Sequence, residues 1–275
     1  MNILEVEEER KSLVVKSNIL IQKSKYSLTP RQYDCINYIV SQIKKNDDRN
    51  KIYTLSINDI CQTIGINPRD GGYAKVKNTL DAIDKLRVWI PIGDKEVRIK
   101  WFNVLRMISG EGTIQVSFAE DIKDFVFELK NRFTKYPAEL SFVLSSRYSK
   151  YLYDYLKSIE FKGSETVDME RFSTYICPNS YKEFKGIKQR ILDVAKEEIN
   201  RLTDIKIDYK PISIGSRKTT HLEFTVEKIT DNDELLEHKM ERTKALPYYP
   251  SNQQELDEII HGNPDLIDED EDLPF

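Results

Sequence analysis

Two groups of cationic side chains in residues 181–227 have the chemistry to bind a polyanion. The first lies in the stretch YKEFKGIKQR and the second in the stretch GSRKTT. Lysine and arginine neutralise phosphates, and arginine and glutamine can also donate hydrogen bonds to base edges in the DNA major groove. The candidate DNA-binding residues of this segment are Lys182, Lys185, Lys188, Gln189, Arg190, Arg217 and Lys218.

The elements around these cations follow the order of a winged helix. Apolar residues recur at helical spacing, and two alternating strands then flank a polar tip at residues 213–220. In a winged helix the helix enters the major groove and the wing lies on phosphates, so both places need cations. A solvated helix face beside a hairpin has the same pattern, which alone leaves both interpretations open. The positions expected to face inward are Phe184, Ile187, Ile191, Val194, Ala195, Ile199 and Leu202 of the helix, and Ile205, Ile207, Tyr209, Leu222, Phe224 and Val226 of the strands.

A family resemblance favours the winged helix. The stretches EFKGIKQRILDVAKEEIN, LTDIKIDY and GSRKTTHLEF resemble the C-terminal DNA-binding domain of plasmid replication initiators that bind iterons and start theta-type replication. The resemblance implies that Lys188, Gln189 and Arg190 read the iteron, although Gln189 stands where a relative can carry a third cation. It also implies that monomers bind origin direct repeats, while dimers joined through the first domain bind an operator inverted repeat and repress the protein's own promoter.

The first half of the chain repeats the same order of elements. Thr29 and Pro30 begin a helix, a strand is expected at residues 52–56, and helices are expected at residues 59–64 and 73–86. Strands are expected at residues 88–92, 97–102, 104–108 and 113–118, and another helical stretch at residues 119–130. The helix at residues 73–86 turns Tyr73, Val76, Leu80 and Ile83 inward. Its candidate DNA-binding residues are Lys75, Lys77 and Asn78, joined by Arg98 and Lys100, which share a face of the strand at residues 97–102.

The predicted fold class is α+β, with two tandem winged-helix domains and a disordered acidic C-terminal tail. A long helix rich in tyrosine is expected at residues 141–160 and begins the second repeat. Because the two halves share one order of elements, they suggest an old duplication. The predicted division is an N-terminal arm at residues 1–25, a first winged-helix domain for dimerisation and DNA binding at 26–137, a second for iteron binding at 138–230, and the tail at 231–275.

The tail concentrates negative charge. Residues 231–275 hold 14 acidic and 3 basic residues, a net charge of −11, which leaves +7 on the body of a chain whose total is −4. A basic body with an acidic tail suggests nucleic acid as the partner, and the tail's composition predicts disorder. The last residues resemble the tip of bacterial single-stranded-DNA-binding protein, whose terminal phenylalanine and carboxylate dock into a basic-rimmed apolar pocket. The candidate partner-binding residues are Asp270, Glu271, Asp272, Leu273, Pro274 and Phe275.

This second resemblance implies a host replication protein as partner, such as a restart helicase or primase. The alternatives are a solubilising tail or one that folds back on the basic DNA-binding face.

Catalytic motifs are absent from the sequence. A rolling-circle nuclease needs a metal-binding histidine pair, but His221, His238 and His261 are isolated, so the tyrosines at 148–155 are expected in a helix core. No Gly-Lys dipeptide of a P-loop occurs. We therefore expect no enzyme activity, cofactor or metal. Three widely spaced cysteines and the lack of a long apolar run predict a cytoplasmic protein without a membrane partner.

Two functions remain open from the sequence. The first is an initiator that binds double-stranded origin DNA and helps to open it. The second is a tandem winged-helix transcriptional regulator without a replication role. The DNA-binding residues would be the same in both, so the tail distinguishes them.

Overall fold

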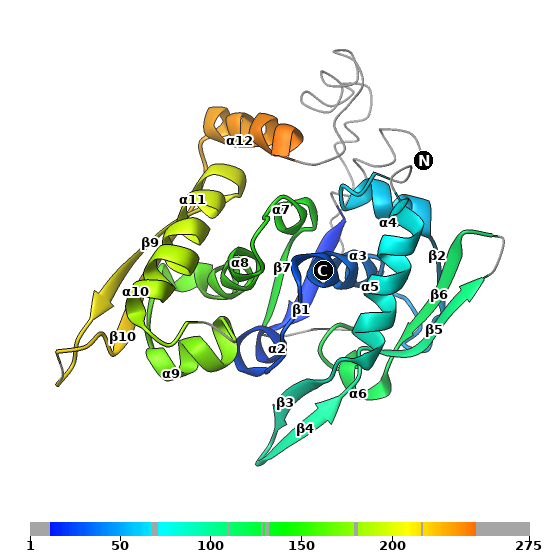
Figure 1. The fold of residues 1–275 in the computed structure, drawn as a ribbon, viewed down its shortest axis with the longest axis horizontal. Coiled ribbons are helices and arrows are strands. Elements are labelled where there is room, and N and C mark those ends of the chain that lie inside the picture. The colour runs from blue at the N-terminus through cyan, green and yellow to red at the C-terminus, as the bar shows by residue number, and fades with distance from the viewer. Residues whose placement is uncertain are drawn as a thin grey trace.

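The computed structural model describes residues 12–67, 71–108, 111–127, 129, 132–178, 181–215 and 217–245 (Figure 1). One order of elements, namely helix, strand, helix, helix and two-stranded wing, occurs twice along the chain. The first copy consists of α3 (Pro30–Ser41), β2 (Tyr53–Ser56), α4 (Ile57–Thr63), α5 (Tyr73–Lys85), β5 (Phe102–Ile108) and β6 (Thr113–Phe118). The second consists of α8 (Arg147–Ile159), β8 (Ser164–Asp168), α9 (Met169–Arg171) with η3 (Phe172–Ile176), one helix built from α10 (Phe184–Ile187), η4 (Lys188–Leu192) and α11 (Asp193–Leu202), and the strands β9 (Ile205–Ile212) and β10 (His221–Lys228).

The two copies also share sheet topology. Their strand orders are β2-β6-β5 and β8-β10-β9, so in each sheet the early short strand pairs with the last wing strand. All these pairings are antiparallel. Each sheet turns its alternate apolar residues towards the helices of its own domain, as Leu222, Phe224 and Val226 do in β10. The prediction of two tandem winged-helix domains is confirmed.

A hairpin distinguishes the first domain from the second. It consists of β3 (Val88–Ile92) and β4 (Lys95–Ile99) and is inserted between α5 and the wing. Gly93, with a φ of 59°, lets the chain reverse within two residues, so that β4 begins before the predicted start at residue 97 and ends before residue 102. Lys100 therefore lies beyond the strand that carries Arg98, and the expectation that both share a strand face is wrong.

Two predicted helices are shorter than expected. The stretch at residues 119–130 forms only α6 (Glu120–Lys123), and the long helix at residues 141–160 is split into α7 (Glu139–Phe142) and α8. Helix α8 starts after Ser146, because the Ser146 hydroxyl accepts a hydrogen bond from the Tyr148 amide at 3.2 Å and caps the N-terminus of the helix. Two residues predicted to face inward are exposed, namely Tyr73 at 44% and Val194 at 37%.

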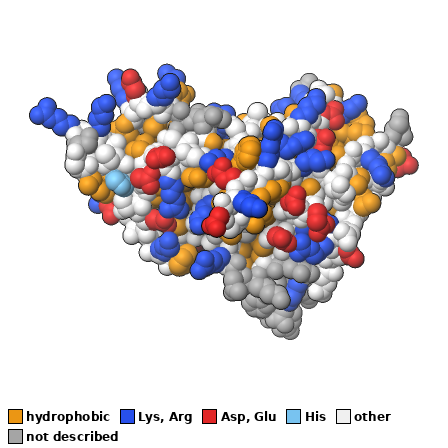
Figure 2. All heavy atoms as spheres, turned by 90° about the horizontal axis from the view of Figure 1, so that it is seen from below, with side chains coloured by type: hydrophobic (Ala, Val, Ile, Leu, Met, Phe, Trp, Pro, Cys, Tyr) orange, Lys and Arg blue, Asp and Glu red, His pale blue; other side chains and the backbone are white. Residues whose placement is uncertain are grey.

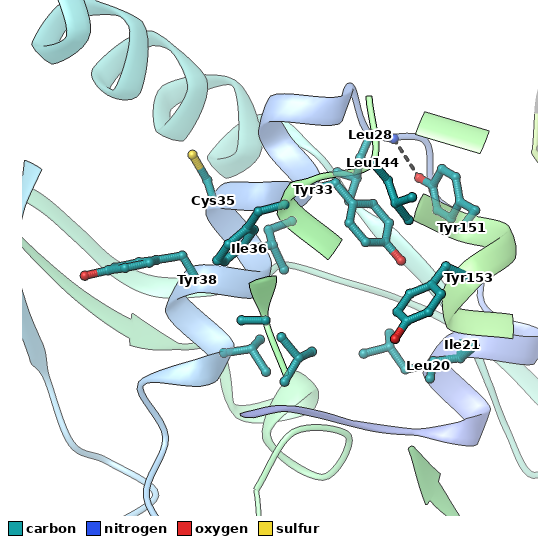
Figure 3. Close-up of a cluster of buried hydrophobic side chains, with 14 of the residues drawn as sticks. Leu20, Ile21, Leu28, Tyr33, Cys35, Ile36, Tyr38, Leu144, Tyr151 and Tyr153 are labelled. Carbon is teal, nitrogen blue, oxygen red and sulfur yellow. Dashed lines mark hydrogen bonds between the residues drawn. The ribbon is translucent and has the colours of Figure 1, made fainter. Parts of the chain in front are cut away.

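The start of the chain is part of the first domain's structure. β1 (Leu13–Ser17) pairs antiparallel with β7 (Phe133–Pro137), and α2 (Asn18–Lys23) follows it directly. Thr29 caps α3 through the Gln32 amide, while the Gln32 side chain accepts from the Thr29 amide. Figure 3 shows how α2, α3 and α8 meet, with the Leu28 amide donating to the Tyr151 hydroxyl at 2.8 Å.

Helix α8 packs into the cores of both domains. On one side its Asp154 carboxylate accepts hydrogen bonds from Lys16, Tyr33 and Tyr136, all of the first domain. On the other side the Tyr153 hydroxyl donates at 2.9 Å to Asp204, which lies between the end of α11 and β9. Its tyrosines at 151, 153 and 155 are buried, as expected for a helix core.

The tail begins with a helix that the composition did not predict. α12 (Asn232–Ala245) packs against α11, and His238 is buried, with its Nδ1 donating to the Thr203 carbonyl at 2.7 Å. Arg242 donates to the Leu202 carbonyl at 3.3 Å, so both side chains satisfy carbonyls at the C-terminal end of α11. The expectation of disorder from residue 231 is therefore wrong for residues 232–245. Residues 246–275, with the acidic tip, lie outside the described residues.

The buried ion pair gives a stability prediction. Replacing Asp154→Asn keeps an acceptor for the tyrosine hydroxyls but leaves Lys16 buried without a counter-charge, since both side chains are 3% exposed. We expect the free energy of unfolding in urea to fall by about 3–5 kcal/mol. The double variant Lys16→Met with Asp154→Asn removes both charges, keeps an acceptor for the tyrosine hydroxyls and should recover most of this loss. A single variant within about 1 kcal/mol of the parent would contradict the assigned role.

Candidate nucleic-acid interface

The recognition helix of the second domain contains a π-turn. Between α10 and α11 the Asp193 amide donates to the Lys188 carbonyl, five residues back, rather than four. Ile187, Ile191 and Leu192 are buried beneath this turn. The cations at 182 and 185, together with Gln189 and Arg190, are exposed on the opposite side.

Lys188 is paired within the helix. Its Nζ lies 2.8 and 2.9 Å from the two carboxylate oxygens of Asp193, which also accepts from the Tyr209 hydroxyl at 2.5 Å. The hydrogen bond from Lys188 lowers the pKa of Asp193, and the same bond raises the pKa of Lys188. Burial, with the bond to Asp193, raises the pKa of Tyr209 to about 12. Of the three residues expected to read bases, Lys188 is thus held by a carboxylate, while Gln189 and Arg190 face solvent.

Tyr181 supports Arg190, a contact that the spacing of the cations did not reveal. The guanidinium lies 5.0 Å from the centre of the Tyr181 ring, and its Nη1 donates to the hydroxyl at 3.4 Å, which raises the pKa of Arg190. Gly186 makes room for this ring, because a Cβ at position 186 would lie 3.0 Å from Tyr181 Cβ. The pairing of a tyrosine with a glycine five residues later was the only sequence signal for this contact.

The wing carries the second group of cations. Arg217 and Lys218 are exposed at the tip between β9 and β10. The tip is closed by Thr220, whose amide donates to the Ile212 carbonyl at 2.9 Å and whose hydroxyl accepts from the Ile214 amide at 2.9 Å. The His221 Nδ1 lies 2.9 Å from the same hydroxyl. Lys210 is a further exposed cation, on β9, which lies outside the two basic stretches of the sequence.

The first domain places its candidates at two ends of α5. Lys77 and Asn78 are exposed early in the helix and Lys75 is half-buried. Arg98 lies instead on the hairpin that follows the C-terminal end of α5, with its guanidinium 5.7 Å from the Trp89 ring centre. Figure 1 shows this hairpin protruding below α5, so Arg98 and Lys100 belong to a different part of the surface from Lys75, Lys77 and Asn78.

Cations gather on both lobes of the molecule. In Figure 2 lysine and arginine side chains cluster along the upper edge of the left and right lobes, with a hollowed surface between them.

Among the described residues no group of three metal-ligating side chains is found. No helix in the described part of the chain has the length and apolarity needed to cross a membrane.

Comparisons with known proteins match both domains. Residues 13–157 match the family described as "Initiator Replication protein, WH1", and residues 169–226 match "Initiator Rep protein, WH2". The chain belongs to this family of replication initiators. A curated "Replication initiation protein" of Escherichia coli is 22% identical over 226 residues, which cover 78% of this initiator and 69% of that protein.

A solved structure has the same fold. The crystal structure of Pi initiator protein in complex with iteron DNA matches with a TM-score of 0.67 and 18% identity, covering 81% of this initiator and 99% of that chain. The family match favours the initiator over the transcriptional regulator as the function of the two winged helices.

The Lys188–Asp193 pair gives a prediction about specificity. Asp193→Asn frees Lys188 to meet a phosphate, so we expect the initiator to bind every duplex more tightly. The slope of log K against log salt should steepen by about 0.9. Fluorescence anisotropy with a random-sequence duplex at several salt concentrations measures both effects. The double variant Lys188→Gln with Asp193→Asn should lose the gain; a gain that persists without Lys188 would contradict this assignment.

Proposed function

We propose that this initiator binds double-stranded direct repeats at a plasmid replication origin, with both winged-helix domains engaged on one repeat. The supporting observation is that α8 packs against both winged-helix domains and joins them, and that each domain carries exposed cations on its helix and wing. The Pi protein, which shares the fold, has been crystallised with iteron DNA. Two recognition helices in successive major grooves would be about 10 bp apart, so each repeat should span roughly 20 bp.

The side chains divide by what each could contact. Gln189 and Arg190 are exposed on the recognition helix and can donate to base edges, as can Asn78 of the first domain. Lys77, Lys182, Lys185, Arg217 and Lys218 are suited to phosphates, which fix the register of the protein on the duplex. Opening of an adjacent AT-rich segment would be driven by strain from these contacts, and the proposal assigns the chain no catalytic step or cofactor.

Self-association and autoregulation are part of the same proposal. Dimers joined through the first domain would bind an operator inverted repeat and repress the initiator's own promoter, while monomers bind the origin. The site of action would be the cytoplasm, which suits three buried free cysteines.

The C-terminal tip is proposed to recruit host replication proteins. Asp270 to Phe275 lie outside the described residues, so the support is the sequence alone: an acidic run leads into Leu273, Pro274 and Phe275, which resemble the tip of bacterial single-stranded-DNA-binding protein. Acidic side chains speed encounter with a basic pocket, and a terminal ring with its carboxylate can be recognised together. Helix α12 fixes where this tail leaves the second domain.

Arg190 and Lys218 should respond differently to removal. Arg190→Ala should weaken binding about tenfold and relax base preference at one position, because it is placed to read a base. Lys218→Ala should weaken all sequences alike. A footprint on the initiator's own upstream DNA locates the repeats, and anisotropy on single-base variants of one repeat measures preference. Equal tolerance of both substitutions would mean that the second domain is not the base-reading domain.

Deletion of residues 272–275 tests the tail separately. We expect the shortened initiator to protect the same repeats with unchanged affinity but to lose capture of purified primase and restart helicase from the host. The matched control is Phe275→Tyr, which retains a ring and the terminal carboxylate. Capture that is unchanged by the deletion would rule out the tip as the recruiting element.

A further inference from the structure

A hollow of about 550 Å³ lies where the two domains meet, and none of the DNA-interface residues lines it. The start of β7, the end of α8, the short helix η2 (Glu160–Lys162) and the end of β10 surround it. Its volume falls within the range of small-ligand sites. The residues that carry the argument are Arg132, Lys157, Glu160, Phe161 and Lys228.

The aromatic side chain of Phe161 lines this hollow and is exposed to solvent. Phe161 is 80% exposed, more than any other large hydrophobic side chain that the structure describes. Lys162 lies beside it, with its Nζ 5.7 Å from the ring centre and 3.1 Å from the Glu165 carboxylate, so this lysine is paired and the cations considered below lie elsewhere at the hollow. A solvent-exposed ring among cations is the arrangement on which single-stranded nucleic acids stack their bases.

Two of the three cations at the hollow are without an ionic partner in the part of the chain that the structure describes. The third, Lys157, is already neutralised, since it forms ion pairs with Glu160 and, at 2.9 Å, with Asp204. Arg132 and Lys228 are exposed, and among the described residues neither side chain has a hydrogen bond or ion pair. The hollow therefore carries positive charge that is free to bind an anion.

Arg132 has an unusual backbone. Its φ of 53° is the only positive value at a non-glycine residue in the described ranges. The Asn18 amide donates to its carbonyl at 2.8 Å and fixes this conformation. A non-glycine residue with a positive φ is strained, so this conformation is kept only where the surrounding structure stabilises it. Such residues are often found at binding sites.

We propose that this hollow binds single-stranded DNA, with one base stacked on Phe161 and neighbouring phosphates held by Arg132 and Lys228. An open ring face suits a flat base whose partner strand has left, whereas a duplex hides its base faces. The biological role rests on the proposed function, because an initiator that opens a duplex exposes single strands beside its repeats. Binding itself is testable without that function.

The first experiment uses the full chain and a fluorescein-labelled dT12 oligonucleotide in fluorescence anisotropy. Phe161→Ala should weaken binding about tenfold, and Phe161→Tyr should retain it, since the ring is kept. Arg132→Asn removes the charge while tolerating the positive φ, and Lys228→Gln removes the other. Each charge removal should flatten the salt slope by about 0.7. Ile92→Ala and Lys95→Gln, exposed on the β3–β4 hairpin, are matched controls and should change nothing.

Two further measurements separate the alternatives. Arg190→Ala should weaken duplex binding and leave dT12 binding intact, so failure of the proposed function is distinguishable from failure of this site. A dT12 carrying 5-iodouracil should cross-link under ultraviolet light to the peptide that contains Phe161. The proposal is overturned if folded Phe161→Ala binds dT12 like the parent, or if cross-links fall only on the recognition helix or wing. It is also overturned if the hollow variants lose a labelled peptide of residues 264–275 but keep dT12, because the occupant is then an acidic peptide.

Discussion

The buried carboxylate of Asp154 is the interaction on which the arrangement of the two domains depends. It accepts from Lys16 of β1, Tyr33 of α3 and Tyr136 of β7, so one side chain of α8 joins three elements of the first domain. One turn earlier, Lys150 lies 2.6 Å from Asp34 of α3 and donates to the Ser141 carbonyl at 2.5 Å. Burying these charges is costly unless all are paired, so few positions of α8 satisfy them. Because well-packed apolar side chains can often replace such a network at little cost in stability, we expect its main effect to be the defined position of α8.

The opposite face of α8 gives the second domain an equally defined position. Tyr153 and Lys157, one turn apart, both bind Asp204 at 2.9 Å, and Asp204 lies between the recognition helix and β9. Tyr155 packs edge-on against Phe224 of the wing strand with ring centres 6.2 Å apart. Helix α12 adds a further support, because Arg242 contacts both the Leu202 carbonyl and, at 3.6 Å, Glu139 of α7. None of these contacts involves a candidate DNA-binding residue, and together they fix the position of the helix α10–α11 relative to the first domain.

The sequence predicted the elements that depend on local signals. Thr29 and Pro30 located the start of α3, and alternation located the wing strands, because caps and two-residue periodicity are local properties. The misses depend on contacts between distant residues. Helix α12 has a weak apolar pattern and is held by polar side chains on the end of α11, which composition does not encode. The pairing of Lys188 with Asp193 and the stacking of Arg190 on Tyr181 require the π-turn and the glycine, and neither is visible in a count of cations.

The π-turn explains both an error of prediction and a property of the interface. Its extra residue rotates the following part of the helix, so Leu192 is buried where regular spacing would place Val194, which is exposed. The same extra residue lets Lys188 reach Asp193, five positions on. A cation neutralised by its own helix attracts random DNA less than a free one does, because non-specific binding is the sum of phosphate contacts. At a site where the helix fits the groove, we expect phosphate to compete with Asp193 for Lys188, so that the pairing would lower non-specific affinity more than specific affinity. A protein that must find a few repeats among many competing sequences needs this ratio more than it needs raw affinity.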